Sequence, residues 1–333
     1  MIPKKHKLLF WLVLAAYSTF FAEVFAGSDM LPFFNIWGIF VVVPLYGLHV
    51  VLLTSIIFKY GKPTLSTLVF AGMLFGLYEA YMTKVLWQPN WDAPLIVGEV
   101  AVLEVFVLVF WWHTWFSFIT PLILAERLLT SSRLVLDGLT GKFRRFYSGW
   151  KGYLALIIFG GIFQSVNSPS IGHSLLSGIS TGGFLILLTK LWKWITKGQG
   201  YTLPELLPDK KEFRFLAIWL GTLYLFLGFA IFPERIPGLV GQGIILALYA
   251  LVIALFIRAL RASAQETQVE LEYPSTPAKY WFIIWLVFVI TLVAAISFLG
   301  SSSGIIALGS WFLGSAISIL LFVKALRRNY ENL

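Results

Sequence analysis

Apolar runs long enough to cross a lipid bilayer recur along the whole chain, and this feature restricts its possible folds most. A transmembrane helix needs about 20 consecutive, mostly apolar residues. About ten such runs are present, at residues 8–26, 36–58, 64–86, 95–122, 153–167, 171–192, 213–232, 238–259, 279–299 and 304–325. The sequence therefore predicts an all-α, polytopic integral membrane helical bundle. The fifth run is short and leaves open whether it spans fully.

The composition agrees with burial in lipid. Hydrophobic residues make up 59% of the 333 positions, and charged residues only 12%, which is about half the charged share of a soluble domain. Because the bilayer core offers no water to backbone amides, each run must satisfy them internally, as a helix does. The alternating polarity of membrane β-strands is absent from these runs. The lipid bilayer is thus the first partner we expect.

The basic residues predict the orientation. If the N-terminus is cytoplasmic, ten spans leave every lysine and arginine on the cytoplasmic side except Lys84 and Arg235. Membrane proteins carry such an excess of cations in their cytoplasmic loops. We therefore expect a multi-pass protein of the cell membrane with both termini in the cytoplasm. We also expect anionic lipid headgroups at its cytoplasmic face.

The net charge of +9 follows from this topology, so we expect no nucleic-acid partner. The absence of cysteine excludes disulfides, thiolate metal sites and a cysteine nucleophile. The nucleotide-binding patterns G-x-x-x-x-G-K-[ST] and G-x-G-x-x-G, and the zinc-protease pattern H-E-x-x-H, are also missing. The oligomeric state is not indicated.

Residues 123–152 form the longest polar interruption and mix cations with bulky apolar residues. This mixture is typical of an amphipathic segment at the membrane surface. We therefore divide the chain into an N-terminal four-helix membrane unit (1–122), a basic cytoplasmic connection (123–152) and a C-terminal six-helix membrane unit (153–333). The first run resembles a signal peptide, but Glu23 interrupts its cleavage region, so we expect it to be retained.

Ionisable side chains inside the spans are the main candidates for function, because they are costly in lipid unless they have partners. The carboxylates all fall in the first four runs. The full set of candidates is Glu23, Glu79, Glu99, Glu104, His49, His113 and His173.

Counting 1.5 Å per residue along straight helices predicts similar depths for Glu79 and Glu104, and a separation of about 10–15 Å between Glu79 and His113. Lys84 lies five residues after Glu79 and off its helical face, so we expect it to extend toward the membrane surface.

The segment "FWWHTWFSFITPLILAE", residues 110–126, combines two unusual features. His113 and Ser117 are one turn apart and share a helix face. Pro121 cannot donate to the carbonyl of Ser117, so it is expected to kink the helix and to open room for water or a ligand.

These residues resemble the motifs of the CAAX prenyl endopeptidase and bacteriocin-processing superfamily of intramembrane proteases. That family carries E-E-x-x-x-R on one helix, F-x-x-x-H on the next and H-x-x-x-N on a later one. Glu79, Ala80 and Lys84 correspond to the first motif, with its second glutamate replaced and its arginine changed to lysine. The resemblance implies a glutamate that activates water, helped by histidines, for cleavage near a prenylated or apolar C-terminus.

Phe110 and His113 correspond to the second motif with one residue fewer between them, and His173 and Ser177 to the third with Ser for Asn. Alternatively, His113 and Ser117 are the third motif and the second is missing. The pattern "EVFAGS … LYG … YEA … HTWFSFITP" also resembles uncharacterised polytopic membrane proteins of archaea and actinobacteria.

Three functions stay open. An intramembrane protease would use Glu79 as general base, with His113 polarising the scissile carbonyl or binding a divalent metal together with His173. A proton- or cation-coupled transporter of small molecules would use Glu79 and Glu104. A non-catalytic membrane partner or scaffold would use the acids for assembly. No cofactor is identified, and a divalent metal is left open.

We place the protease first because it assigns a reaction to named residues. A separation of about 5 Å or less between Glu79 and His113 would favour hydrolysis. Glu79 facing Glu104 across a hydrated cavity would favour transport.

Overall fold

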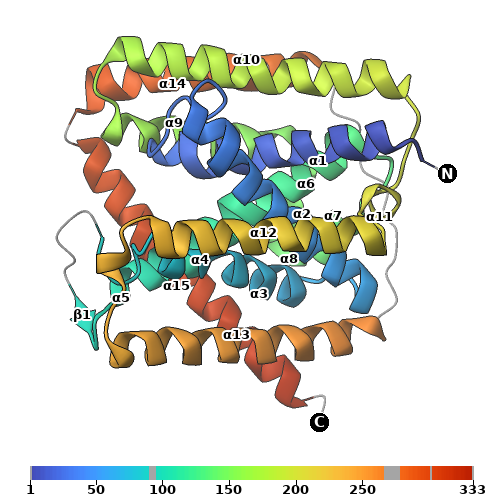
Figure 1. Cartoon of the computed structure of the whole chain (residues 1–333). Coiled ribbons are helices and arrows are strands. Elements are labelled where there is room, and N and C mark those ends of the chain that lie inside the picture. Colours follow the sequence, from blue (N-terminus) through green and yellow to red (C-terminus); the bar gives the residue numbers. More distant parts are fainter. Residues whose placement is uncertain (1, 90–94, 266–277, 301, 332–333) are drawn as a thin grey trace. The chain divides into compact units, whose positions relative to one another are not determined.

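The computed structural model describes residues 2–89, 95–265, 278–300 and 302–331, and these are helical almost throughout (Figure 1). The chain divides into two compact units, which we describe separately. Unit 1 comprises Met1–Gly47, Thr120–Leu207 and Thr267–Ser310. Unit 2 comprises Leu48–Ile119, Pro208–Glu266 and Trp311–Leu333. Each unit thus gathers three separate stretches of sequence. This partition differs from the predicted division of the chain into two membrane units joined by the connection 123–152, and that division stays a prediction.

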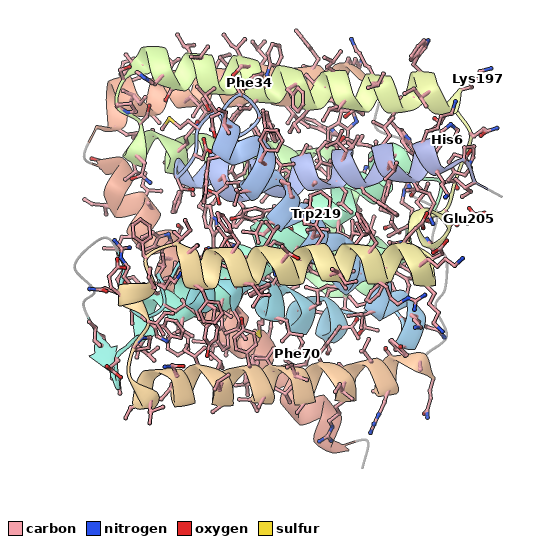
Figure 2. The ribbon with its side chains drawn as sticks, viewed as in Figure 1. His6, Phe34, Phe70, Lys197, Glu205 and Trp219 are labelled. Carbon is pink, nitrogen blue, oxygen red and sulfur yellow. The ribbon has the colours of Figure 1, made fainter. Side chains whose placement is uncertain are left out.

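In unit 1, α1 packs against α6 and α10, and α14 packs against α9 and α10. Its buried core is rich in aromatic side chains such as Phe10, Phe20 and Phe288. His6, labelled in Figure 2, is also buried and hydrogen-bonds Tyr201 through Nδ1 at 2.9 Å. The elements are α1 (Lys4–Thr19), π-helices η1 (Phe20–Val24) and η2 (Gly38–Val42), the start of α2 (Val43–Tyr60), α6 (Thr120–Leu129), α7 (Leu134–Gly138), α8 (Gly141–Ser148), α9 (Trp150–Asn167), α10 (Ile171–Thr196), α11 (Leu203–Leu206), α14 (Ala278–Ala294), π-helix η5 (Ala295–Leu299) and the start of α15 (Ser302–Glu331).

In unit 2, α3 packs against η3 and α13, and α12 contacts α4. Phe70 of α3, labelled in Figure 2, is fully buried and meets the ring of Phe322 edge-on at 5.9 Å. The elements are the rest of α2, α3 (Leu65–Gly76), α4 (Tyr78–Tyr81), β1 (Ile96–Val97), β2 (Val100–Ala101), α5 (Val102–Glu104), the π-helix η3 (Val105–Ile119), α12 (Lys210–Ala230), the 3-10 turn η4 (Pro233–Arg235), α13 (Leu239–Ala264) and the rest of α15.

Local sequence explains where several helices begin. The side chain of Asp209 accepts hydrogen bonds from the backbone of Lys211 and Glu212 at the start of α12. Thr64 forms a capping box with Thr67 at the start of α3. Such side chains satisfy amides that have no partner inside the helix.

A short β-hairpin, whose two strands have two residues each, lies before η3 in the sequence. Ile96 pairs with Ala101 and Val97 with Val100, and the turn residues Gly98 and Glu99 both have positive φ, 54° and 64°. Two positive φ values are the requirement of a type I′ turn. The helical part of the predicted run 95–122 therefore starts at Val102, seven residues later than the run itself.

The prediction of an all-α, multi-pass helical architecture is confirmed. Within the described residues, eight helices are long and apolar enough to cross a membrane. The predicted run 64–86 corresponds to the shorter helical stretch Leu65–Tyr81, and the run 153–167 to α9, which is not among the eight. The orientation of the termini stays a prediction. The eight are Lys4–Val24, Gly38–Tyr60, Val102–Leu129, Ile171–Thr196, Lys210–Ala230, Leu239–Ala264, Lys279–Leu299 and Gly304–Val323.

Candidate functional site

Glu79 and His113 form a direct hydrogen-bonded pair inside unit 2. Glu79 Oε1 lies 2.7 Å from His113 Nε2, and both residues are buried, with 6% and 2% of their surface exposed. The predicted separation of about 10–15 Å was wrong. The depth of His113 was counted from residue 95, but the helix begins at Val102, which removes about 10 Å from that count.

Two glycines one turn apart on α3 bring the pair together. A Cβ atom on Gly72 would lie 2.7 Å from the Cα of Thr114, and one on Gly76 would lie 2.8 Å from the Cα of Val109. Gly76 also faces the Cβ of His113, at 3.1 Å. Small residues four apart let two apolar helices approach until their backbones touch. The backbone of η3 therefore runs directly against α3, within reach of Glu79.

Ser117 extends the pair into a chain of three groups. Its Oγ lies 2.7 Å from His113 Nδ1 and is fully buried. With Glu79 ionised, the neutral tautomer that satisfies all three groups has Nε2–H donating to the carboxylate and the Ser117 hydroxyl donating to Nδ1. A carboxylate, an imidazole and a hydroxyl in this order form the constellation that activates serine nucleophiles, here with the two ring nitrogens exchanged.

The carboxylate of Glu79 has two further donors. The hydroxyl of Thr83 hydrogen-bonds it, as does the side chain of Tyr78. The ring of Tyr78 also meets that of His113 edge-on at 5.0 Å. We call Glu79, His113, Ser117, Thr83 and Tyr78 the Glu79 cluster. Buried polar groups must pair with one another in this way to be tolerated.

His49 belongs to a second hydrogen-bonded chain in the same unit. Its Nε2 lies 2.9 Å from the hydroxyl of Tyr224, which hydrogen-bonds Tyr249. Tyr249 in turn donates to the carbonyl of Leu77 at 2.7 Å. The rings of His49 and His113 both stack on Phe75, at 4.6 and 5.9 Å. The second chain thus ends two residues before Glu79.

The expectation that Lys84 extends to the membrane surface was wrong. Its side chain is fully buried, and Nζ donates to the carbonyls of Leu227, at 2.6 Å, and Ile231. Leu227 lies in the last turn of α12 and Ile231 directly follows the helix, where backbone acceptors have no partner inside the helix. A lysine ammonium satisfies them and also meets the negative end of the helix dipole.

Two further predicted residues of unit 2 are not hydrogen-bond partners of Glu79. Glu104 is buried in α5, but the hydrogen bonds of Glu79 go to His113, Thr83 and Tyr78. The carboxylate of Glu99 accepts hydrogen bonds from Gly238 and Gly241 at the start of α13, both at 3.2 Å.

Two predicted residues belong to unit 1. The carboxylate of Glu23 accepts a hydrogen bond from Tyr46 at 2.5 Å and another from Ser28. His173 is exposed near the start of α10 and pairs with Ser170 at 2.9 Å. Among the described residues, no three His, Asp or Glu side chains gather where they could hold a metal ion.

The helix that carries His113 and Ser117 is π-helical along 15 residues. It returns to α geometry at Thr120, one residue before Pro121. Long i→i+5 segments are rare, and π-helical turns inside α-helices frequently occur at functional sites.

The sequence reasoning missed Thr83, Tyr224 and Tyr249. The signal that could have predicted the pairing of Glu79 with His113 is the Gly72-x-x-x-Gly76 spacing, which marks a close helix contact. Tyrosines inside the apolar runs 213–232 and 238–259 were a second signal, because a buried hydroxyl needs a partner.

The chain belongs to an uncharacterized membrane protein family, whose family model matches residues 12–328. It is 35% identical over 257 residues to an uncharacterized protein of Archaeoglobus fulgidus, covering 75% of this chain and 78% of that protein. No solved structure matches the chain. These findings agree with the expected likeness to archaeal polytopic membrane proteins and carry no link to the CAAX endopeptidase superfamily.

Proposed function

We propose that the protein is a membrane-embedded hydrolase that cleaves an apolar acyl substrate, with Glu79 and His113 as its acid–base pair. The observation that carries this proposal is the 2.7 Å contact between Glu79 Oε1 and His113 Nε2, together with Ser117 Oγ at 2.7 Å from the other ring nitrogen. Acid–base partners must lie within direct or one-water reach, and these three groups do.

The reaction follows from this order of groups. Ser117 Oγ attacks the substrate carbonyl while its proton passes to His113 Nδ1, and Glu79 stabilises the imidazolium that forms. The imidazolium then protonates the leaving group, and water deprotonated by the same nitrogen hydrolyses the acyl-enzyme. In the route implied by the resemblance, the base acts directly on water and Ser117 is not acylated.

The experiment uses the purified full chain in detergent with fluorogenic acyl esters and a prenylated peptide. We expect Glu79→Gln and His113→Gln to lower kcat/KM by about 10²-fold or more, the effect of losing a general base. Ser55→Ala is the matched control, because Ser55 is buried in unit 2 but bonds the carbonyl of Val51 at 2.6 Å. Cleavage that Glu79→Gln leaves unchanged would overturn the proposal.

Ser117→Ala separates the two routes. Loss of both turnover and fluorophosphonate labelling would support acylation of Ser117. Turnover that survives in Ser117→Ala and is lost in Glu79→Gln would support direct attack by water.

A second candidate is proton-coupled transport, favoured by the chain from His49 through Tyr224 and Tyr249 to the carbonyl of Leu77. Buried chains of ionisable groups serve as proton relays in transporters. In proteoliposomes this function predicts solute uptake driven by a pH gradient and lost in both His49→Gln and Glu79→Gln. Uptake that ignores the gradient would argue against it.

A further inference from the structure

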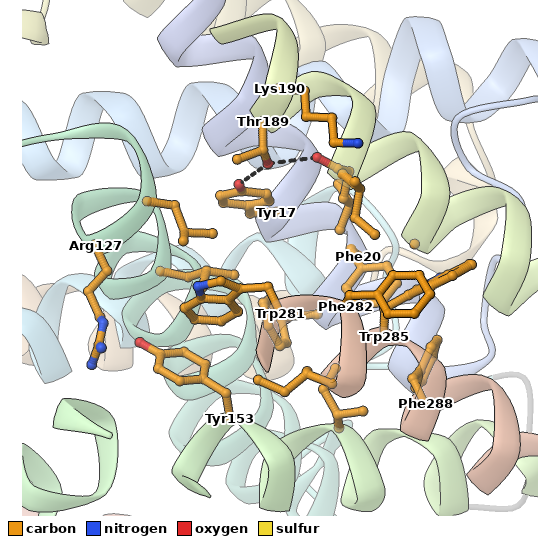
Figure 3. A pocket seen from close by; sticks show the side chains of 18 of the residues that line it. Tyr17, Phe20, Arg127, Tyr153, Thr189, Lys190, Trp281, Phe282, Trp285 and Phe288 are labelled. Carbon is orange, nitrogen blue, oxygen red and sulfur yellow. Dashed lines mark hydrogen bonds between the residues drawn. The ribbon is translucent and has the colours of Figure 1, made fainter. Parts of the chain in front are cut away.

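A second site lies wholly within unit 1 and shares no residue with the Glu79 cluster. It is a cavity of about 670 Å³ between α1, η1, α6, α9, α10 and α14. This volume is typical of small-molecule binding sites. Figure 3 shows Tyr17, Tyr153, Trp281 and Trp285 around it.

The interior of the cavity is aromatic and aliphatic. Phe20 and Phe288, whose ring centroids are 5.4 Å apart, are both almost fully buried. The hydroxyls of Tyr17 and Thr189 satisfy each other through a 2.6 Å hydrogen bond, drawn in Figure 3, and the hydroxyl of Tyr153 is a further polar group of the lining. This part of the cavity therefore suits an apolar chain.

Positive charge borders the same cavity. Of its described lining residues none is acidic, and five are basic: Arg127, Arg133, Lys190, Lys193 and Lys279. The guanidinium of Arg133 is held by backbone carbonyls, including that of Glu126 at 3.0 Å. The carboxylate of Glu126 is itself engaged by the amides of Val135 and Leu136.

The cations gather at one end of the cavity. α10 and α14 are antiparallel neighbours, because Gly178 lies against Leu292 and Val289 whereas Gly182, one turn further along α10, lies against the earlier residue Trp285. Lys193 near the end of α10 therefore lies at the same end as Lys279 at the start of α14. Gly182 is about 16 Å further along α10 from Lys193, among the aromatic rings. Arg127 and Arg133, at and just after the end of α6, complete the basic end.

From this change in the lining, from apolar interior to basic end, we infer that unit 1 binds a single-chain amphiphile whose headgroup is a phosphate monoester with net negative charge. The apolar chain would occupy the aromatic interior, and the phosphate would lie among the lysines and arginines. Arginine and lysine together favour phosphate, because the guanidinium fork binds its oxygens in pairs. All five cations belong to the predicted cytoplasmic connections, where anionic headgroups were expected.

The test measures the binding of three compounds to the full chain by native mass spectrometry. Lysophosphatidic acid has both the chain and an anionic phosphate, lysophosphatidylcholine has the same chain with no net charge, and glycerol 3-phosphate has only the headgroup. We expect lysophosphatidic acid to bind at least tenfold more tightly than either of the others. Equal binding of lysophosphatidylcholine would overturn the headgroup assignment. Equal binding of glycerol 3-phosphate would reduce the site to one for free phosphate and would also overturn the inference.

Variants locate the site. Lys190→Ala with Lys193→Ala should weaken lysophosphatidic acid binding at least tenfold, whereas Lys4→Ala with Lys5→Ala, which removes two exposed lysines of α1 outside the cavity, should not. Ile186→Trp fills the cavity and should also abolish tight binding. Leu187→Trp, on the same helix but 62% exposed and outside the cavity, should leave it intact. Equal effects within either matched pair would overturn the inference. Glu79→Gln should bind lysophosphatidic acid as tightly as the unmodified chain does. This result would show that the binding site of unit 1 is independent of the proposed hydrolysis at Glu79.

Discussion

The Glu79 cluster of unit 2 and the cavity of unit 1 handle polar groups in opposite ways. In the cluster, both ring nitrogens of His113 and one carboxylate oxygen of Glu79 are paired with buried side chains at 2.7 Å, and the other oxygen accepts from the half-buried Thr83. In the cavity, cations border an open volume of about 670 Å³ without a carboxylate among the lining residues. The first arrangement is closed and neutralised, and the second is open and carries excess positive charge.

This difference separates two kinds of function. Groups that exchange protons must be held in contact, and their mutual hydrogen bonds also stabilise the fold. At the cavity, Lys190 and Lys193 are exposed, and exposed charges add little to the stability of the empty protein. Substitutions in the cluster should therefore change the free energy of unfolding strongly, while substitutions of Lys190 and Lys193 should change binding but not folding.

The largest effect is expected for Glu79→Leu. It removes the carboxylate that pairs with His113 Nε2 in a buried site, and breaking a buried pair in this way costs about 3–5 kcal/mol. The hydroxyl of Thr83 keeps the backbone carbonyl of residue 79 as an acceptor, at 2.8 Å. Glu79→Gln keeps an acceptor oxygen and should cost less. Thermal unfolding of both variants in detergent measures the difference. Equal melting temperatures of Glu79→Leu and Glu79→Gln would indicate that the hydrogen bonds of the Glu79 carboxylate do not stabilise the fold.

Gly76→Leu should have the next largest effect. Its side chain would meet the backbone of Val109 and the Cβ of His113, so α3 and η3 must separate, at a cost of about 1–3 kcal/mol. Gly221→Leu on α12 is the matched control, because a Cβ there meets nothing within 4 Å. A melting temperature lowered equally by both variants would contradict the close contact at Gly76.

Much of the fold could be predicted from the sequence, because the bilayer imposes one rule on every long apolar run. That rule gives helices but not their ends. Residues 96–101 belong to an apolar run and yet form a hairpin, since Gly98 and Glu99 adopt the positive φ of a tight turn. One misplaced helix start was enough to separate Glu79 and His113 in the predicted arrangement.

The candidate site was predictable in its residue types and not in its partners. Glu79, His113 and Ser117 were identified because ionisable groups are costly in lipid, and Ser117 lies one turn from His113. Tyr224 and Lys84 depend on contacts with segments more than 140 residues away, which no local pattern encodes. The acceptors of Lys84 are backbone carbonyls, and these leave no trace in the choice of side chain.

Lys84→Met tests this last contact and should have a moderate effect. The carbonyls of Leu227 and Ile231 lose their donor, which costs about 1–2 kcal/mol, while the loss of a buried charge offsets part of that cost. Lys59→Met, at an exposed position of α2 in the same unit, should leave the melting temperature unchanged. A stabilised Lys84→Met would show that desolvation of the ammonium outweighs its hydrogen bonds.

The smallest effect on folding is expected where the effect on binding is largest. Lys190 and Lys193 are exposed and lie one turn apart on α10, beside three further cations. Removing both as Lys190→Ala with Lys193→Ala relieves repulsion between like charges. The free energy of unfolding should therefore change by less than about 0.5 kcal/mol, as for most surface substitutions. Unfolding without ligand, at low and high salt, measures this. A clear loss of stability would mean that these lysines hold the fold together, as the groups of the Glu79 cluster do, and the contrast between the two regions would fail.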